Sequence, residues 1–163
     1  MADHQARPGE VALDLDPGAA RDAQLCFIGR IRSPWTDRAG CPRNLTRARE
    51  AGGGGSVLVD PPFRPGLSGL APGQAIILLY WMHQARRDLI VQNPAHGDGP
   101  RGTFALRSPV RPNPVSLGVV RITALDADAG RIDIDAIDCL DGTPLIDIKP
   151  WLPGVDIPPG HAS

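Results

Sequence analysis

The chain has 163 residues, a formal net charge of −1 and 42% hydrophobic residues, which is enough for one domain with a buried core. A nearly neutral chain has no overall attraction to a polyanion, so any RNA binding must depend on locally clustered arginines. All but one of the 17 basic residues are arginine, and a high-GC coding bias explains this as well as RNA binding does. Aromatic residues make up 4% of the chain, which disfavours a platform that stacks several bases.

The chain shows no sign of secretion, membrane insertion or a disulfide framework. Residues 1–22 have no positively charged start followed by an apolar core, so no signal peptide is expected. The longest apolar run, residues 75–82, is too short to span a bilayer. The three cysteines are widely spaced, which favours plain thiols over a disulfide or zinc site. We therefore expect a cytoplasmic protein with no membrane segment.

The predicted elements are mainly short strands separated by turns rich in Gly and Pro. Residues 1–23 are polar and lack periodicity, which predicts a flexible leader before a domain over residues 24–157 and a tail over 158–163. A long loop is expected over residues 86–102, and short helical turns are compatible with 43–51 and 65–74. Strands are expected over residues 25–32, 57–59, 75–82, 103–106, 115–125 and 131–137.

The stretch RIDIDAI at residues 131–137 has the clearest pattern. Ile132, Ile134 and Ala136 fall on one face and the charged residues on the other, which is the two-residue period of a strand with one solvated face. The strand expected over residues 115–125 can pair with it as a hairpin. No GxGxxG fingerprint follows a strand and no βαβ alternation is visible, which excludes a doubly wound fold. The pattern is typical of an all-β barrel or sandwich with long loops and few short helices.

Two segments concentrate residues that suit recognition of a polar ligand. The first, TFALRSPVRPNPVSLG, holds Arg107 and Arg111 around stiff prolines, with Asn113 between two more prolines. The second, DCLDGTPLIDIKPWLP, holds Asp138 and Asp141 just before a glycine turn. Upstream lie FIGRIRSPW, GCPRN and YWMHQ. In this order, the five blocks resemble the signature blocks of the TsaA-like family, the tRNA (adenine-N6)-methyltransferases often called TrmO.

The resemblance implies a single-sheet β-barrel that binds S-adenosyl-L-methionine (SAM), usually as a homodimer, and methylates threonylcarbamoyl-modified adenosine beside the tRNA anticodon. Asn44 stands where the family usually has Gln after Pro-Arg, and the family's extra C-terminal domain is not expected after residue 163. Carried over onto this sequence, the cofactor contacts fall on Pro42, Arg43, Asn44, His83, Gln84, Arg107, Leu117, Asp138, Cys139, Leu140 and Asp141.

Each of these residues also has a purely structural interpretation. Asp141 and Gly142 can form a simple hairpin turn, Arg107 and Arg111 can be surface ion-pair partners, and His83 can be a packed rim histidine. His83, His96 and Asp98 match no ligand spacing, so no metal site is predicted. No GxSxG motif or recognisable nucleophile–base pair favours a hydrolase.

The expected acceptor determines the expected mechanism. An exocyclic adenine amine is a weak nucleophile. We therefore expect positioning of the amine and fixed dipoles to make the main contributions to catalysis. We assign charge stabilisation or late proton acceptance to Asp138 or Asp141, and substrate orientation to Arg107, Arg111 and Asn113. Three alternatives remain: a non-catalytic SAM or nucleotide sensor, a methyltransferase acting on another RNA or a small molecule, and a bare oligonucleotide-binding barrel.

Overall fold

A computed structural model of the chain describes residues 6–20, 22–94, 97 and 99–160. The chain divides into two compact units. The small unit contains Met1–Leu25 and Met82–Ser116, and the barrel unit contains Cys26–Trp81 and Leu117–Ser163. The predicted limits at residues 23 and 157 stay a prediction. No helix among the described residues is long and apolar enough to cross a membrane.

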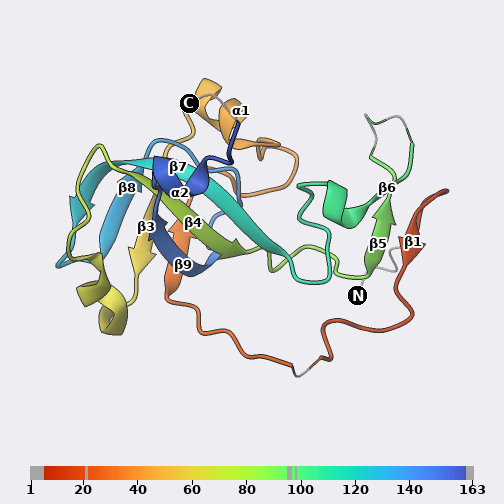
Figure 1. Ribbon diagram of the computed structural model, residues 1–163. Coiled ribbons are helices and arrows are strands. Elements are labelled where there is room, and N and C mark those ends of the chain that lie inside the picture. Colours follow the sequence, from red (N-terminus) through yellow and green to blue (C-terminus); the bar gives the residue numbers. More distant parts are fainter. Residues whose placement is uncertain (1–5, 21, 95–96, 98, 161–163) are drawn as a thin grey trace. The chain divides into compact units, whose positions relative to one another are not determined.

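A closed β-barrel forms the barrel unit, as the sequence predicts (Figure 1). Among the described residues its strand order is β2-β3-β8-β7-β4-β9. Antiparallel pairing of β2 with both β3 and β9 closes the ring. The strands are β2 (Gly29–Arg32), β3 (Gly55–Val59), β4 (Ala75–Trp81), β7 (Val115–Asp126), β8 (Arg131–Ile134) and β9 (Pro144–Pro150).

Alternating side chains fill the barrel. Ile132 and Ile134 of β8 are buried while Asp133 between them is half-buried, which confirms the predicted two-residue period. The predicted hairpin is also confirmed, because β7 pairs antiparallel with β8. In β4, Ile76, Leu78 and Tyr80 are at most 2% exposed, so alternate residues of an almost continuous apolar run form the core. The strand β9 was not predicted.

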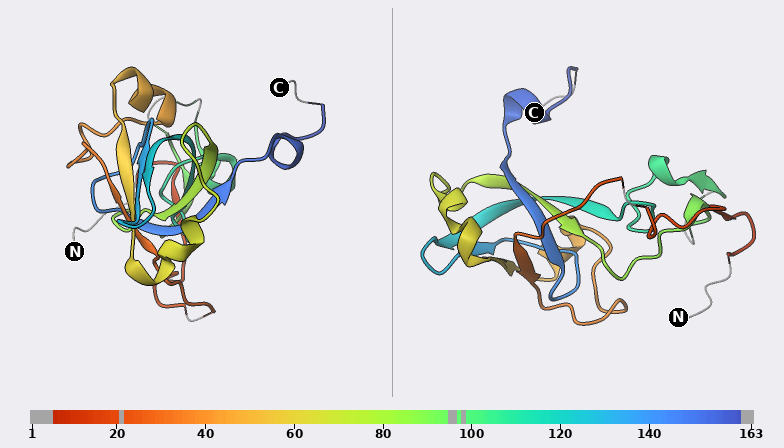
Figure 2. Two further views of the ribbon diagram at one scale, coloured as in Figure 1. Left: turned by 90° about the vertical axis from the view of Figure 1, so that its left-hand side faces the viewer. Right: turned by 90° about the horizontal axis from the view of Figure 1, so that it is seen from below.

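Short helices connect the strands. The helix α1 (Leu45–Glu50) confirms the helical turn expected there, and the Asn44 side chain caps it by accepting from the Arg47 backbone N–H. The 3₁₀ helix η1 (Pro61–Leu67) precedes β4. The helix α2 (Pro153–Asp156) projects from the end of β9, away from the barrel (Figure 2).

The small unit contains a second sheet that the sequence did not predict. Its strands, in the order β1-β5-β6, are β1 (Val11–Ala12), β5 (Leu89–Gln92) and β6 (Arg101–Gly102). The prediction of an unbroken loop over residues 86–102 was therefore wrong. The many prolines and glycines of that stretch lie mostly between β5 and β6, and the apolar run Leu89–Gln92 pairs with both neighbours.

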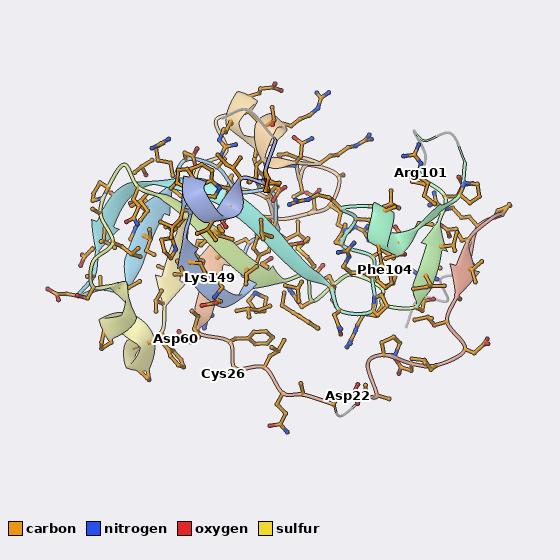
Figure 3. The ribbon with its side chains drawn as sticks, viewed as in Figure 1. Asp22, Cys26, Asp60, Arg101, Phe104 and Lys149 are labelled. Carbon is orange, nitrogen blue, oxygen red and sulfur yellow. The ribbon has the colours of Figure 1, made fainter. Side chains whose placement is uncertain are left out.

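Two strand predictions require correction. Residues 103–106 form a 3₁₀ turn, η2 (Thr103–Ala105), instead of a strand. The buried Arg111 guanidinium accounts for this shape, since it binds the carbonyl oxygens of Thr103 and Leu106 at 3.1 and 2.6 Å. Phe104 is left 80% exposed (Figure 3). The strand expected over residues 25–32 begins only at Gly29, because Leu25 and Phe27 are exposed and hydrogen bonding to β9 starts at Ile28.

We expect the stability of the small unit to fall in acid because of one carboxylate. The Glu10 side chain is 2% exposed and accepts from the Arg7 guanidinium at 2.7 Å, so Arg7 lowers the Glu10 pKa from 4.5 to about 2. A carboxylate with a lowered pKa stabilises the fold above its unfolded-state value, and this contribution disappears as the pH falls through its folded-state value. The protection factors of the β5 amides, which compare each exchange rate with that of an unfolded chain at the same pH, should therefore fall between pH 4.5 and about 2. In Glu10→Gln this fall should be smaller, and identical pH profiles would contradict the assignment.

Candidate functional site

The segment between β8 and β9 is held by an unusual set of hydrogen bonds. The carbonyl oxygens of four consecutive residues, 137–140, each accept a bond from a side chain. In chain order the donors are Trp35 Nε1 (2.6 Å), Cys41 Sγ (3.4 Å), Ser33 Oγ (2.7 Å) and Thr143 Oγ1 (2.7 Å). Because most of these donors lie in the loop between β2 and α1, that loop fixes the backbone of the segment.

The two predicted catalytic carboxylates have different surroundings. Asp141 Oδ1 accepts from Arg32 Nε at 2.8 Å and from the Ser33 backbone N–H at 3.0 Å. Asp138 Oδ1 accepts from the Tyr80 hydroxyl at 2.8 Å. Within the described residues, Asp138 Oδ2 accepts no hydrogen bond from the protein. Each carboxylate therefore has an Oδ2 without a donor among the described residues. They differ in their partners: Asp141 is paired with the Arg32 cation, whereas Asp138 is held by the neutral Tyr80 hydroxyl group.

One backbone N–H group beside Asp138 can also serve a ligand. The carbonyls of Cys139 and Leu140 are bonded to side chains. Their N–H groups donate to no acceptor in the described part of the chain. Cys139 is fully buried, whereas Leu140 is partly exposed. A planar heterocycle or a carboxylate at this segment could therefore accept from the Leu140 N–H.

The predicted contacts Pro42, Arg43 and Asn44 lie in the loop that leads into α1. Cys41 Sγ donates to the Asp138 carbonyl oxygen, which connects this loop directly to the β8–β9 segment. Asn44 Oδ1 accepts from the Arg47 N–H at 2.9 Å as the α1 cap, so its amide group has a structural role. Arg43 is exposed and makes no ion pair with any described residue. Its guanidinium can therefore bind an anionic group.

Leu117 lies on β7 beside the same residues. It is 41% exposed, and the next residue, Gly118, is buried against Tyr80 and Leu45. A Cβ atom built on Gly118 would lie 3.4 Å from Leu45 Cδ1 and 3.6 Å from the Tyr80 hydroxyl oxygen. The fold therefore brings together one group of predicted site residues in the barrel unit: Pro42, Arg43, Asn44, Leu117, Asp138, Cys139, Leu140 and Asp141.

Cys139 of this group and Cys41, which donates to the Asp138 carbonyl, are poor nucleophiles. Burial raises the pKa of the Cys139 thiol to about 12, and burial followed by the Asp138 charge also raises the Cys41 pKa. Since the thiolate is the reactive form, both side chains remain protonated near neutral pH. Their contribution is the Cys41 hydrogen bond and the packing of Cys139.

The remaining predicted residues, His83, Gln84, Arg107, Arg111 and Asn113, belong to the small unit. His83 and Gln84 are exposed in the turn after β4, with their side-chain nitrogens 3.4 Å apart. Arg111 donates to the backbone carbonyls of Thr103 and Leu106, and its buried Nε has no hydrogen-bond partner in the described part of the chain. Asn113 Oδ1 accepts from Arg87 Nη2 at 3.4 Å. The binding and orienting roles of these residues stay predictions.

Several residues that shape the site were absent from the predicted set. Tyr80, Trp35, Ser33 and Cys41 all donate to the β8–β9 segment. The sequence blocks contained these residues: FIGRIRSPW holds Ser33 and Trp35, GCPRN holds Cys41, and YWMHQ holds Tyr80. Membership of these blocks was the sequence signal that could have identified them. No group of three or more potential metal ligands occurs among the described residues, and His96 and Asp98 lie outside them.

Comparisons with known proteins point to one family. The family model described as the tRNA-methyltransferase O N-terminal domain matches residues 30–157. A probable SAM-binding protein, VirR, of Rhizobium radiobacter is 37% identical over 150 residues, which cover 92% of this chain and 82% of that protein. A putative SAM-dependent methyltransferase, RcsF, of Pseudomonas aeruginosa is 39% identical over 135 residues, which cover 79% of this chain and 57% of that protein.

Solved structures agree with the sequence comparison. The crystal structure of TrmO from Pseudomonas aeruginosa superposes with a TM-score of 0.68 and 31% identity, over 87% of this chain and 62% of that chain. This chain therefore spans less than two thirds of the length of that solved relative. Because the family model covers most of the chain and the barrel is shared, the chain belongs to the family of the tRNA-methyltransferase O N-terminal domain.

Proposed function

We propose that this protein binds SAM and transfers its methyl group to N6 of threonylcarbamoyl-modified adenosine next to the tRNA anticodon. The observation that carries the proposal is the fixed segment 138–141, whose Asp138 carboxylate accepts from Tyr80 and whose backbone is bonded to Ser33 and Cys41. The family model and the names of the relatives support SAM as the cofactor and methyl transfer as the type of reaction.

The described residues provide groups that match the chemistry of SAM. A sulfonium cation is stabilised by carboxylate and carbonyl oxygens, and Asp138 Oδ2 is such an oxygen without a protein donor among the described residues. An adenine edge can accept from the N–H group of Leu140, which is partly exposed. The amino-acid carboxylate can bind the Arg43 guanidinium. Pro42, Asn44, Leu117 and Asp141 complete the proposed contacts in the barrel unit, and His83, Gln84 and Arg107 are proposed contacts from the small unit.

Bound SAM supplies an electrophilic methyl group attached to a positively charged sulfur. The protein's own contribution is orientation and charge. Asp138 holds a negative charge near the reacting centre, and its position is fixed by Tyr80 and by the hydrogen-bonded backbone. We propose that Asp138 stabilises the positive charge that develops on the adenine amine and accepts its proton after methylation. Arg111 and Asn113 are the proposed orienting residues for the acceptor.

Two measurements test this proposal in order. Isothermal calorimetry should detect SAM binding, and S-adenosylhomocysteine should compete for the site. Mass analysis of tRNA incubated with protein and SAM should then show one added methyl group on tRNA that carries the threonylcarbamoyl modification and none on tRNA that lacks it. Absence of SAM binding would contradict the whole proposal.

A second candidate function follows from the names of several relatives. These proteins are called probable SAM-binding proteins, with no reaction stated. Binding of SAM without methylation of any tRNA would favour a sensor module, whereas methylation of another RNA or of a small molecule would change only the acceptor. RNA binding with a steep salt dependence and no response to SAM would instead indicate a bare oligonucleotide-binding barrel.

We predict that the arginines near α1 contact the tRNA backbone. Arg32, Arg49 and Arg131 pair with aspartates. Arg38 and Arg47, in contrast, are exposed and make no ion pair with any described residue. Arg47→Glu should therefore weaken tRNA binding by about tenfold at moderate salt and reduce the slope of log affinity against log salt by about one. Filter binding over a salt series measures both quantities.

Arg131→Glu is the matched control, because it makes the same change of charge at a residue already paired with Asp133. Its effect on tRNA affinity should be smaller than that of Arg47→Glu. Equal losses in the two variants would show that only the net charge matters and that α1 makes no local contact. The homodimer implied by the family resemblance is a separate proposal, which sedimentation equilibrium of the full chain would test.

A further inference from the structure

The position of Tyr80 depends on an irregularity in the barrel. The strands β4 and β9 pair regularly from Ile76 to Leu79, but the register shifts between Leu79 and Tyr80, so that Tyr80 pairs with Leu145. A bulge of this kind changes the direction of a side chain and is common next to functional sites. Tyr80 is 2% exposed, so its ring belongs to the core while its hydroxyl group lies at a polar segment.

The Tyr80 hydroxyl donates to Asp138 Oδ1 at 2.8 Å. A carboxylate can rotate about its last side-chain bond, so a fixed donor on one oxygen also fixes the direction of the other. The backbone of Asp138 is held independently, since its carbonyl accepts from Cys41 and the neighbouring carbonyls accept from Trp35 and Ser33. Tyr80 therefore restrains the two side-chain torsions of Asp138, and with them the orientation of the carboxylate.

Tyr80 also touches the other two parts of the proposed site. The absence of a side chain at Gly118 lets the Tyr80 ring and Leu45 approach β7 closely, directly beside Leu117. Leu45 follows Asn44 and is the first residue of α1. The Tyr80 side chain thus lies next to the start of α1, next to β7 and at the β8–β9 segment. Each of these three parts of the barrel unit carries or adjoins proposed cofactor contacts.

We infer that Tyr80 is a positioning residue that directs Asp138 Oδ2 toward the cofactor through the hydrogen bond to Oδ1. This inference rests on the proposed SAM-binding function. Tyr80 itself does not touch SAM in this arrangement, and its effect is exerted entirely through Asp138. A purely structural role, by contrast, would act through packing of the ring and would not depend on the Asp138 charge.

A double-mutant cycle separates these two roles. Tyr80→Phe keeps the ring and removes the hydroxyl, and it should weaken SAM binding roughly tenfold, as expected for loss of a hydrogen bond to a charged group. In an Asp138→Asn background the same change should weaken binding by less than about twofold, because there is no charged oxygen left to direct. An equal loss in both backgrounds, or no loss in either, would overturn the inference.

A spectroscopic measurement tests the same hydrogen bond without SAM. Tyr80 is the only tyrosine of the chain, so protein labelled with ring-¹³C tyrosine gives a single Cζ resonance. This resonance should move in Asp138→Asn and should move again when SAM is added to the unsubstituted protein. If Asp138→Asn leaves it unchanged, the positioning role is wrong even if SAM binds. If calorimetry detects no SAM binding while the resonance responds to Asp138→Asn, the proposed function is wrong. The Tyr80–Asp138 hydrogen bond would then be confirmed, but without a role in cofactor binding.

Discussion

Asp138→Asn is expected to lower the rate of methyl transfer about 10²-fold, which is typical for loss of one electrostatic contact to a transition state. The substitution keeps an oxygen that can accept from Tyr80 but removes the negative charge. The barrel should therefore fold normally while the stabilisation of developing positive charge is lost. Single-turnover kinetics with saturating SAM measure the rate of the chemical step apart from cofactor binding.

Asp141→Asn is the matched control, because Asp141 lies three residues after Asp138 on the same fixed segment. Its Oδ1 already accepts from Arg32 and Ser33, so we expect a loss of stability of about 1 kcal/mol and a rate within about threefold of the unsubstituted protein. Unchanged turnover in both Asp138→Asn and Asp141→Asn would show that neither carboxylate takes part in methyl transfer. A large loss in Asp141→Asn alone would reverse the assignment.

Gly29→Ala is expected to lower the free energy of unfolding of the barrel by about 3 kcal/mol. A Cβ atom at this position would overlap the Leu58 carbonyl oxygen and would lie 3.0 Å from the Val59 Cα. These are backbone atoms of β3, which is paired with β2, so they cannot move aside without separating the strands. Urea unfolding followed by far-UV circular dichroism measures the change.

The control for this prediction is Gly66→Ala. Gly66 lies in η1, has no positive φ angle, and a Cβ atom there would meet nothing within 4 Å. The free energy of unfolding of Gly66→Ala should stay within about 0.5 kcal/mol of that of the unsubstituted protein. Equal unfolding midpoints for the two variants would contradict the close approach of β2 and β3. Failure of Gly29→Ala alone to yield soluble protein would agree with it.

Most of the barrel could be predicted from local pattern. Two patterns correspond to observed strands: the alternation of Ile132, Asp133 and Ile134 in β8, and the apolar run of β4. The predictions failed where a long-range contact determined the local conformation. Thr103 to Ala105 form a 3₁₀ turn because Arg111 binds their neighbouring carbonyls, and Leu89–Gln92 becomes a strand because β1 and β6 lie on either side.

In the candidate site, too, local sequence patterns were predictive and long-range contacts were not. The blocks around Arg43, Leu117 and Asp138 identified the family from sequence alone, and the family model confirms that assignment. The different surroundings of Asp138 and Asp141 could not be predicted, because both are aspartates on one short segment and their distinct partners, Tyr80 and Arg32, come from strands far away in the chain.

The amino-acid sequence by itself determined the all-β class, the positions of most barrel strands along the chain and the family, because side-chain periodicity and short blocks of residues are local properties. Tertiary structure alone decided that Asp141 is paired with a cation, Arg32, while Asp138 is held by the neutral hydroxyl group of Tyr80. Those properties depend on hydrogen bonds between Asp138 and residues such as Cys41 and Tyr80 that are far apart in the chain. Only closure of the barrel brings these residues within bonding distance.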